Sequence, residues 1–332
     1  MIILRLFLLP LSLVYYCIVS VRNFLYSVNI FKSISFNTPI ISIGNITTGG
    51  TGKTPFVIFL TNHFISKGKS IGVISRGYKR KSSDLVIAYD GKSVTSDVHS
   101  TGDELLMIIN RFLGNDKFFA IAYHDRVKAI NEMINKFSPD IIILDDAFQN
   151  RKIVKTIDIV IQDKENKTIL NNLLLPGGNL RETNNALKRA DVVLNNYKFD
   201  KSIPSEENVI KYEFTGLFDG LGKRVEIPKE KKAVLFSGIA NNSSFQNVVS
   251  KQNINIIKKF EFFDHYNYTS VEIDKFKALY KEDLVYITTE KDFIKIREFK
   301  EFISNYPVYY LRIDVILINS SLDNLLRKKN IL

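Results

Sequence analysis

The fold is decided by residues 41–55, which read ISIGNITTGGTGKTP. An apolar run leads into a glycine-rich turn, and a Lys-Thr pair then opens a helical stretch, which is the context of a phosphate-binding loop. The glycines let backbone N–H groups close around phosphate oxygens, and the helix N-terminus adds the positive end of its dipole. The lysine is expected to neutralise β- and γ-phosphates, and the following threonine to hold Mg²⁺. The predicted nucleotide-binding residues are Thr48, Gly49, Gly50, Thr51, Gly52, Lys53 and Thr54.

The loop is a variant of the common P-loop. The strict pattern G-x-x-x-x-G-K-[ST] has glycine at position 47, where this chain has Thr47. The fit is better to G-G-x-G-K-[ST]. ATPases of the partitioning type carry a lysine directly before the two glycines, and Thr48 occupies that place, which argues against a dimer-activated ATPase. Because no Asn-Lys-x-Asp guanine signature follows, ATP is favoured over GTP.

A second acidic element supports a nucleotide site. Residues 141–146 read IIILDD, an apolar strand that ends in paired carboxylates, as in a Walker B element. One carboxylate of the pair Asp145 and Asp146 is expected to orient Mg²⁺ through its water shell, because Mg²⁺ keeps several waters when it binds protein.

Apolar runs typical of buried parallel strands alternate with helical stretches over the first two-thirds of the chain. Strands are expected at 39–43, 70–74, 85–89, 118–123, 141–144, 157–161 and 192–194, and helices at 54–67, 103–113, 125–137 and 184–190. The rhythm is lost over residues 195–230, apart from a strand at 209–214. It resumes with strands at 233–236, 254–260, 284–288 and 308–313, and helices at 243–250, 271–280 and 322–329.

This alternation predicts an α/β fold, in which a P-loop domain has a doubly wound, mostly parallel sheet. A second, smaller α/β domain and an N-terminal membrane-associated helix complete it. We expect an apolar helix in 1–35, the nucleotide-binding domain in 36–200, a hinge or linker in 201–230 and the smaller domain in 231–332.

The N-terminus carries a membrane signal. Leu6–Val21 has no charge and lies between Arg5 and Arg22. As a helix it is slightly shorter than the ~20 residues of a full crossing. No A-x-A-like cleavage site follows the run, which argues against a secretory signal peptide. A buried core helix is another alternative. A membrane anchor, spanning or interfacial, is preferred, and deleting residues 1–35 is expected to release the protein from membranes.

Bulk composition limits the partners. The net charge of +11 favours anionic partners such as acidic lipid headgroups, phosphorylated substrates or nucleic acid. The absence of a long Lys/Arg-only block weakens the nucleic-acid interpretation. Cys17 is the one cysteine, so no intramolecular disulfide forms, as suits a reducing compartment.

Further motifs follow in a fixed order: LLPL at 8–11, GN at 44–45, GGTGKTP at 49–55, SRGY at 75–78, GDE at 102–104, DDAFQ at 145–149, LLPGGNLRE at 174–182, FDH at 263–265 and TEKD at 289–292. Any one of them is weak, but their joint order is highly specific. In this order the chain resembles the tetraacyldisaccharide 4′-kinase family, the lipid A 4′-kinases, from its N-terminus to about residue 295.

The resemblance implies an enzyme on the cytoplasmic face of the bacterial inner membrane. With ATP and Mg²⁺ it would phosphorylate the 4′-hydroxyl of a tetraacylated glucosamine disaccharide 1-phosphate. Its expected partners are this lipid A disaccharide precursor and an anionic membrane surface, with no nucleic acid and no obligate protein partner.

The same resemblance assigns roles to residues. Asp103 is the expected base that accepts the hydroxyl proton, and His265 is expected to pair with it and tune it. Lys53 and Asp146 complete the catalytic set, and Thr54, Asp145 and Glu104 are the expected metal ligands. Arginine forks suit phosphate oxygens. The expected substrate-binding residues are Arg76, Arg126, Gln149, Asn150, Arg181 and Glu182, of which the resemblance favours the last two most. The charged run of Glu290, Lys291 and Asp292 suits a solvated helix start, and the resemblance suggests instead that it closes over the nucleotide.

Two features depart from the family pattern Asp-Asp-Gly-Phe-Gln-His and from its usual Ala-Gly-Pro before Leu-Arg-Glu. Ala147 and Asn150 replace the Gly and the His, and residues 177–179 are Gly-Gly-Asn.

Two other functions compete with the kinase. One is a soluble P-loop enzyme such as an ATP-dependent ligase, which the apolar N-terminus disfavours. The other is a membrane-attached, ATP-driven switch of the variant-loop class, which Thr48 disfavours.

Overall fold

The computed structural model describes residues 5, 7–78, 80–95, 97–164, 172–199 and 208–332. Its strands are β1 (Ile40–Gly44), β2 (Ile71–Ser75), β3 (Val86–Tyr89), β4 (Phe118–Ala122), β5 (Ile141–Asp145), β6 (Ile157–Asp163), β7 (Val192–Asn196), β8 (Val209–Phe218), β9 (Arg224–Val225), β10 (Lys232–Ser237), β11 (Asn255–Glu261), β12 (Leu284–Thr289) and β13 (Val308–Ile318).

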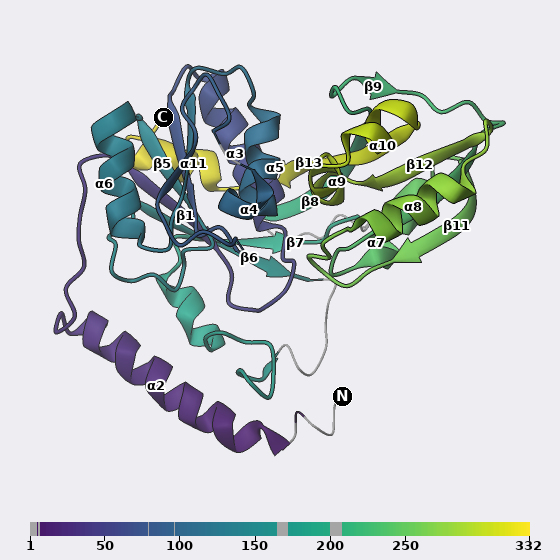
Figure 1. Ribbon diagram of the computed structural model, residues 1–332. Coiled ribbons are helices and arrows are strands. Elements are labelled where there is room, and N and C mark those ends of the chain that lie inside the picture. Colours follow the sequence, from purple (N-terminus) through teal and green to yellow (C-terminus); the bar gives the residue numbers. More distant parts are fainter. Residues whose placement is uncertain (1–4, 6, 79, 96, 165–171, 200–207) are drawn as a thin grey trace.

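The helices are α2 (Leu9–Ser27), α3 (Lys53–Ser66), α4 (Val98–Thr101), α5 (Asp103–Arg111), α6 (Arg126–Phe137), the 3-10 helix η2 (Asn184–Arg189), α7 (Asn242–Ser250), α8 (Ser270–Leu279), α9 (Glu290–Ile296), α10 (Lys300–Asn305) and α11 (Leu322–Lys328). Figure 1 shows α3 to α6 gathered around one half of the molecule and α7 to α10 around the other.

The described strands join one 13-stranded sheet in the order β11-β10-β12-β13-β8-β7-β6-β1-β5-β2-β4-β3, with β9 paired to β8. Most neighbouring strands run parallel. The exceptions among them are β3 with β4, β8 with β13 and β8 with β9. The large, mostly parallel α/β sheet confirms the fold class predicted from the sequence.

Strand β1 lies at the centre of the first half. It pairs in parallel with β5 and β6, so that Ile41 is opposite both Ile143 and Ile157. All five of its residues are buried because helices cover both faces of the sheet. Helices α3, α5 and α11 pack on one face and α6 on the other. The carboxyl ends of these parallel strands meet at one edge, which is where ligands bind in such sheets.

The second half repeats this layering on a smaller scale. Strands β10, β11 and β12 run parallel to one another, and β13 runs parallel to β12. Helix α7 contributes Phe245 and Val249 to the apolar layer on one face. Helices α8, α9 and α10 pack on the other face through an aromatic-rich cluster that includes Phe276, Phe293 and Phe302.

A long antiparallel pair joins the two halves. Strand β13 pairs with β8 from Tyr310 opposite Phe218 to Ile318 opposite Val209, and β8 also pairs with β7. The chain then returns to the first half, where Leu322 and Leu326 of α11 belong to the same buried cluster as Phe56 of α3. The predicted division at residues 201–230 remains a prediction, and residues 201–207 of it lie outside the described residues.

Helix α2 lies outside the helices and strands of the two halves and runs along the first half (Figure 1). Among the described helices it alone is long and apolar enough to cross a membrane, and only 6% of its most apolar 18-residue window is buried. Polar side chains attach it to the body. The Ser12 hydroxyl donates to the Leu174 carbonyl at 3.0 Å, and the Tyr15 hydroxyl donates to the Arg181 carbonyl at 2.9 Å. The helix therefore presents an apolar face outward and a polar face to the protein.

Two local expectations differ from the structure. The segment expected as a helix at 184–190 is a 3-10 helix, Asn184–Arg189. Its leading asparagines favour turns over regular helix. A helix, α9, does begin at Glu290, but the charged run at 290–292 is not the solvated helix start that the sequence suggested. Asp292 and Lys295 of α9 are buried and pair with each other at 3.3 Å, so these charges belong to the interior and not to a solvated surface.

Candidate active site

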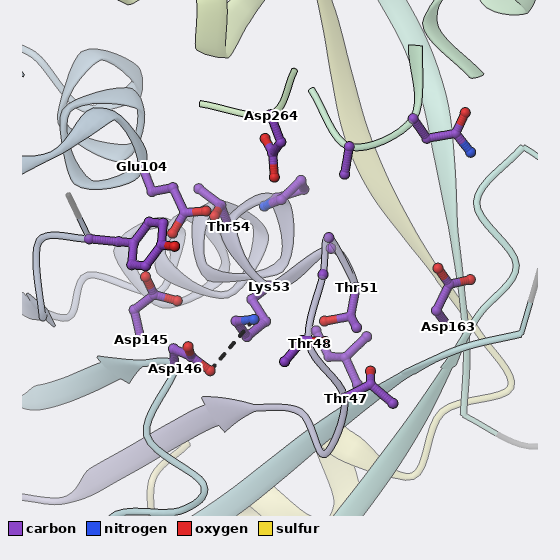
Figure 2. A pocket seen from close by; sticks show the side chains of 18 of the residues that line it. Thr47, Thr48, Thr51, Lys53, Thr54, Glu104, Asp145, Asp146, Asp163 and Asp264 are labelled. Carbon is purple, nitrogen blue, oxygen red and sulfur yellow. Dashed lines mark ion pairs between the residues drawn. The ribbon is translucent and has the colours of Figure 1, made fainter. Parts of the chain in front are cut away.

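A cavity of about 1810 Å³ opens at the carboxyl edge of the first half, and residues of both halves line it. Small-molecule pockets commonly enclose roughly 300–1,000 Å³, so this cavity has room for two substrates. The phosphate loop forms its floor in Figure 2, and Asp264 of the second half faces that loop from across the cavity.

The phosphate loop is held in place by side-chain amides. Asn45 donates to the Thr51 hydroxyl at 2.9 Å, and Asn196 at the end of β7 donates to the Thr51 carbonyl at 2.8 Å. Gly52 has a φ of 92°, and a Cβ there would lie 1.7 Å from the Tyr212 hydroxyl. Only glycine fits this position. The loop is thus fixed before a nucleotide arrives.

Asp146 is held between two cations. Lys53, the first residue of α3, places its Nζ 3.5 Å from Asp146 Oδ1 (Figure 2). Arg181 Nη1 donates to both carboxylate oxygens, at 3.0 and 2.9 Å. Burial favours a raised pKa for Asp146, but the charges of Lys53 and Arg181 outweigh it and lower the pKa. The Asp146 carboxylate is therefore ionised and shared between the phosphate loop and Arg181.

The pKa of Asp145, the last residue of β5, is shifted in the opposite direction to that of Asp146. Its Oδ2 accepts from the Ser75 hydroxyl at 3.3 Å, and its buried Oδ1 has no hydrogen-bond partner among the described residues. Burial, then the negative charges of Glu104 and Asp146, raise the pKa of Asp145 to about 7. The positive charges of Lys53 and Arg126 offset this only in part, so negative charge is in excess around the Asp145 carboxyl group.

A divalent cation fits this deficit. The hydroxyl of Thr54 and the carboxylates of Asp145 and Glu104 line the cavity beside Lys53 (Figure 2), and hard oxygen ligands are those that Mg²⁺ prefers. Among the described residues, no three His, Cys, Asp or Glu side chains form a metal cage by themselves. A site with few protein ligands is the usual form for Mg²⁺ that also binds nucleotide phosphates and water.

The predicted Asp103–His265 pair is formed across the two halves. His265 Nδ1 lies 2.8 Å from Asp103 Oδ2, and its Nε2 lies 3.1 Å from Lys291 Nζ. An ammonium can only donate, so Nε2 is the accepting nitrogen and Nδ1 carries the proton toward Asp103. Tyr78 packs edge-on against the imidazole, with ring centroids 5.0 Å apart. The ring is thus fixed in both tautomer and orientation.

Asp103 itself lies behind the histidine. Its side chain is 6% exposed and is not part of the cavity wall, whereas His265 and Asp264 are. Burial alone would raise its pKa, but the hydrogen bond from His265 and the charges of Lys291 and Lys295 lower the pKa to about 2. Asp103 is therefore a firmly ionised partner of the imidazole.

Two groups of the remaining predicted residues line the cavity. Arg76, Gln149 and Asn150 line the cavity with the nucleotide residues already described. Arg126 lines it too, yet it is buried and its guanidinium donates to the backbone carbonyls of Asp145 and Tyr123.

Glu182 belongs to neither group, since it does not line the cavity. It is 2% exposed, and its Oε2 accepts from Arg189 at 2.7 Å and from Asn23 of α2 at 3.1 Å. This carboxylate holds α2 against the loop that carries Arg181.

Sequence reasoning missed several contributors. Lys295 approaches Asp103 to 3.5 Å from a position that the sequence gives no reason to single out. Tyr15 and Arg22 of the apolar N-terminal helix also line the cavity. The available signal was the seven-residue spacing of these two polar side chains, which places both on one face of a helix.

Comparison with known proteins gives a consistent result. The family model described as tetraacyldisaccharide-1-P 4′-kinase matches residues 4–330. The chain is 32% identical over 312 residues to the tetraacyldisaccharide 4′-kinase of Aquifex aeolicus (strain VF5), covering 92% of this chain and 94% of that protein. It is 35% identical to that of Wigglesworthia glossinidia brevipalpis, covering 92% and 81%. The crystal structure of LpxK from Aquifex aeolicus in complex with ATP aligns with a TM-score of 0.82 at 31% identity, covering 98% and 99%.

Proposed function

The chain belongs to the tetraacyldisaccharide-1-P 4′-kinase family, and from that premise we propose how its residues carry out the family's reaction. The protein is an ATP-dependent kinase of lipid A biosynthesis that phosphorylates the 4′-hydroxyl of the disaccharide precursor. The observation that carries the proposed mechanism is the meeting of a phosphate loop with the Asp103–His265 pair at one cavity that both halves line.

The first half binds the triphosphate. The N–H groups of Gly49 to Thr54 surround the phosphates at the start of α3, and Lys53 adds a full positive charge. When ATP enters, the Lys53 ammonium exchanges its 3.5 Å contact with Asp146 for phosphate oxygens. Arg181 still pairs with Asp146 and keeps that carboxylate in place.

Thr54, Asp145 and Glu104 are the residues that would hold Mg²⁺. Bound there with ATP, the cation neutralises charge on the phosphate oxygens. The raised pKa of Asp145 and its unpartnered oxygen support this assignment, since a cation there would add to the counter-charge that Lys53 and Arg126 supply only in part.

Phosphoryl transfer then needs a proton acceptor. The 4′-hydroxyl oxygen bonds to the γ-phosphorus as the bond from that phosphorus to the β–γ bridging oxygen breaks, and ADP leaves. The hydroxyl proton passes to the Asp103–His265 pair, whose imidazole faces the cavity. Asp103 holds the imidazole tautomer and balances the charge that it gains. For Nε2 to take this proton, the Lys291 ammonium, 3.1 Å away, must first release its hydrogen bond to that nitrogen.

Helix α2 places the site at the membrane. Its outward side chains are apolar and exposed, for example Leu13 (64%), Ile18 (62%) and Phe24 (62%). Its inward side is tied to the body by Tyr15, Arg22 and other polar residues, so lipid cannot surround the helix. We expect it to lie in the interface on the cytoplasmic face of the inner membrane, where ATP is available. The net positive charge of the chain suits anionic headgroups.

The activity is tested with purified protein in detergent micelles, γ-labelled ATP, Mg²⁺ and tetraacyldisaccharide 1-phosphate. Label is expected in the lipid fraction, and chelation of Mg²⁺ by EDTA should abolish it. Label should also be lost in Lys53→Ala and Asp103→Ala. ATP hydrolysis by folded protein without labelled lipid would contradict the proposed acceptor and favour a different one.

Membrane attachment is tested on the outward face of α2. Introducing Leu13→Glu, Ile18→Glu and Phe24→Glu together should move the protein from the membrane pellet to the soluble fraction, because burying each apolar side chain contributes about 1.5–3 kcal/mol. Transfer to a detergent-solubilised acceptor should continue. The matched control is Leu221→Glu, at a 95% exposed position beside β9, which should leave the protein in the pellet. A triple variant that still pellets would disprove this mode of attachment.

A further inference from the structure

A buried ion pair connects the two halves beside the active site. Arg111, the last residue of α5, directs Nε and Nη2 at the two carboxylate oxygens of Glu290, the first residue of α9. The Nη2–Oε2 distance is 2.7 Å. The same guanidinium donates to the Ile313 carbonyl at 3.0 Å and to Asp314 Oδ1 at 2.8 Å. One side chain thus ties α5 to both α9 and β13.

The burial of this pair requires an explanation. The side chains of Arg111 and Glu290 are 4% and 8% exposed. Taking two charges out of water is costly, and well-packed apolar residues often stabilise a fold as well as a buried pair does. What an apolar contact lacks is direction. A guanidinium fork on a carboxylate fixes both distance and angle, because two parallel N–H···O bonds form only in one plane.

The two helices that this pair joins also carry the residues around the catalytic histidine. Asp103 is the first residue of α5, eight positions before Arg111. Lys291 follows Glu290 directly, and Lys295 lies one turn later on α9. Their ammonium groups lie 3.9 and 3.5 Å from Asp103 Oδ2. A shift of α9 against α5 would therefore change the surroundings of the Asp103–His265 pair.

We propose that the Arg111–Glu290 pair is a positioning element that fixes α9 against α5, and so sets Lys291 and Lys295 against the Asp103–His265 pair. Neither residue transfers a proton or contacts phosphate in this role. The inference rests on the proposed function, because it concerns the geometry of that site.

Other contacts between the helices are less directional. Arg297 Nη1 donates to Asn110 Oδ1 at 2.8 Å, but this is one exposed bond to a neutral group. Ile294 of α9 packs in the apolar cluster that also contains Ile108 of α5, and apolar contacts tolerate sliding. Lys291 and Lys295 also approach Asp103 of α5, but an ammonium is a point charge without a fork. Among the described residues, Arg111–Glu290 is therefore the bidentate charged contact between α5 and α9.

The test compares Arg111→Lys and Glu290→Gln with the wild-type full-length protein in the lipid-labelling assay. Arg111→Lys keeps the charge and loses the fork, so kcat is expected to fall about tenfold while KM for ATP changes less than twofold, since small misplacements of catalytic groups slow the chemical step. Neither variant should lower kcat further in a His265→Ala background, because both act through that residue.

The matched control is Met133→Ala. Met133 lies on α6, is 0% exposed and belongs to a buried cluster that contains no residue of α5 or α9. It should lower the melting temperature as much as Arg111→Lys or more, without changing kcat per folded molecule. If Arg111 has a purely structural role, Arg111→Lys should likewise lower the melting temperature without changing kcat per folded molecule. That outcome would overturn the inference. Equal losses in the wild-type and His265→Ala backgrounds would overturn it too. Failure of the wild-type protein to label lipid would instead count against the proposed function.

Discussion

Replacing Lys53 by methionine is expected to lower kcat for lipid phosphorylation by about 10²–10³-fold. Lys53 is the cation that the phosphate loop brings to the cavity floor, and removing one group that stabilises transition-state charge costs about this much in other enzymes. The fold should survive, because Arg181 still neutralises Asp146 when Lys53 is gone. Initial rates of label transfer at saturating ATP, with melting temperatures measured alongside, give the comparison.

A lysine outside the cavity provides the control. Lys128 lies exposed on α6, and Lys128→Met should have a wild-type rate. If Lys53→Met retained more than a tenth of the wild-type kcat, the phosphate loop would not be the centre of charge neutralisation. Loss of rate together with a lowered melting temperature would show instead that the Lys53–Asp146 contact maintains the fold.

Asp103→Asn and His265→Ala are each expected to reduce kcat by about 10²–10⁴-fold, the range of general acid–base contributions. The amide of Asn keeps the shape of Asp103 and removes the charge that stabilises the protonated imidazole. Because the two residues act as one unit at 2.8 Å, the double variant should be no slower than the slower single variant. Single-turnover phosphorylation measured for all three variants tests this expectation.

Losses of kcat that multiply in the double variant would contradict the paired role of Asp103 and His265. If the double variant lost the product of the two single effects, Asp103 and His265 would act in separate steps. The control is Asp274→Asn on the exposed side of α8, which removes a carboxylate from the second half without touching the cavity. Its rate should equal that of the wild-type protein.

Much of the fold follows from local pattern. The largely apolar runs at Ile40–Gly44 and Ile141–Asp145 are fully buried parallel strands, as their composition predicts. The phosphate loop and the two aspartates at the end of β5 could be placed together, because parallel strands bring their carboxyl ends to one edge. The pairing of Asp103 with His265, 162 residues apart, came from resemblance to a family and not from spacing.

What the sequence does not reveal depends on distant partners. Arg111 ends a short amphipathic helix, and nothing near it indicates that it is buried against Glu290, 179 residues later. The burial of Lys295 is equally hard to predict, since a lysine three residues after Asp292 is typical of a solvated helix face. Charges become internal here only because the second half folds against α5, and a local pattern carries no information about that contact.

The return of α11 to the first half affects how the protein is made. Leu322, Leu326 and Ile331 complete the buried cluster that covers α3, although α3 ends at Ser66. A ribosome adds roughly 5–20 residues per second, so the apolar face of α3 waits on the order of tens of seconds for its last covering side chains. Exposed apolar surface of this kind invites aggregation during synthesis. The helix behind the phosphate loop is therefore among the first elements to be synthesised and among the last to be enclosed.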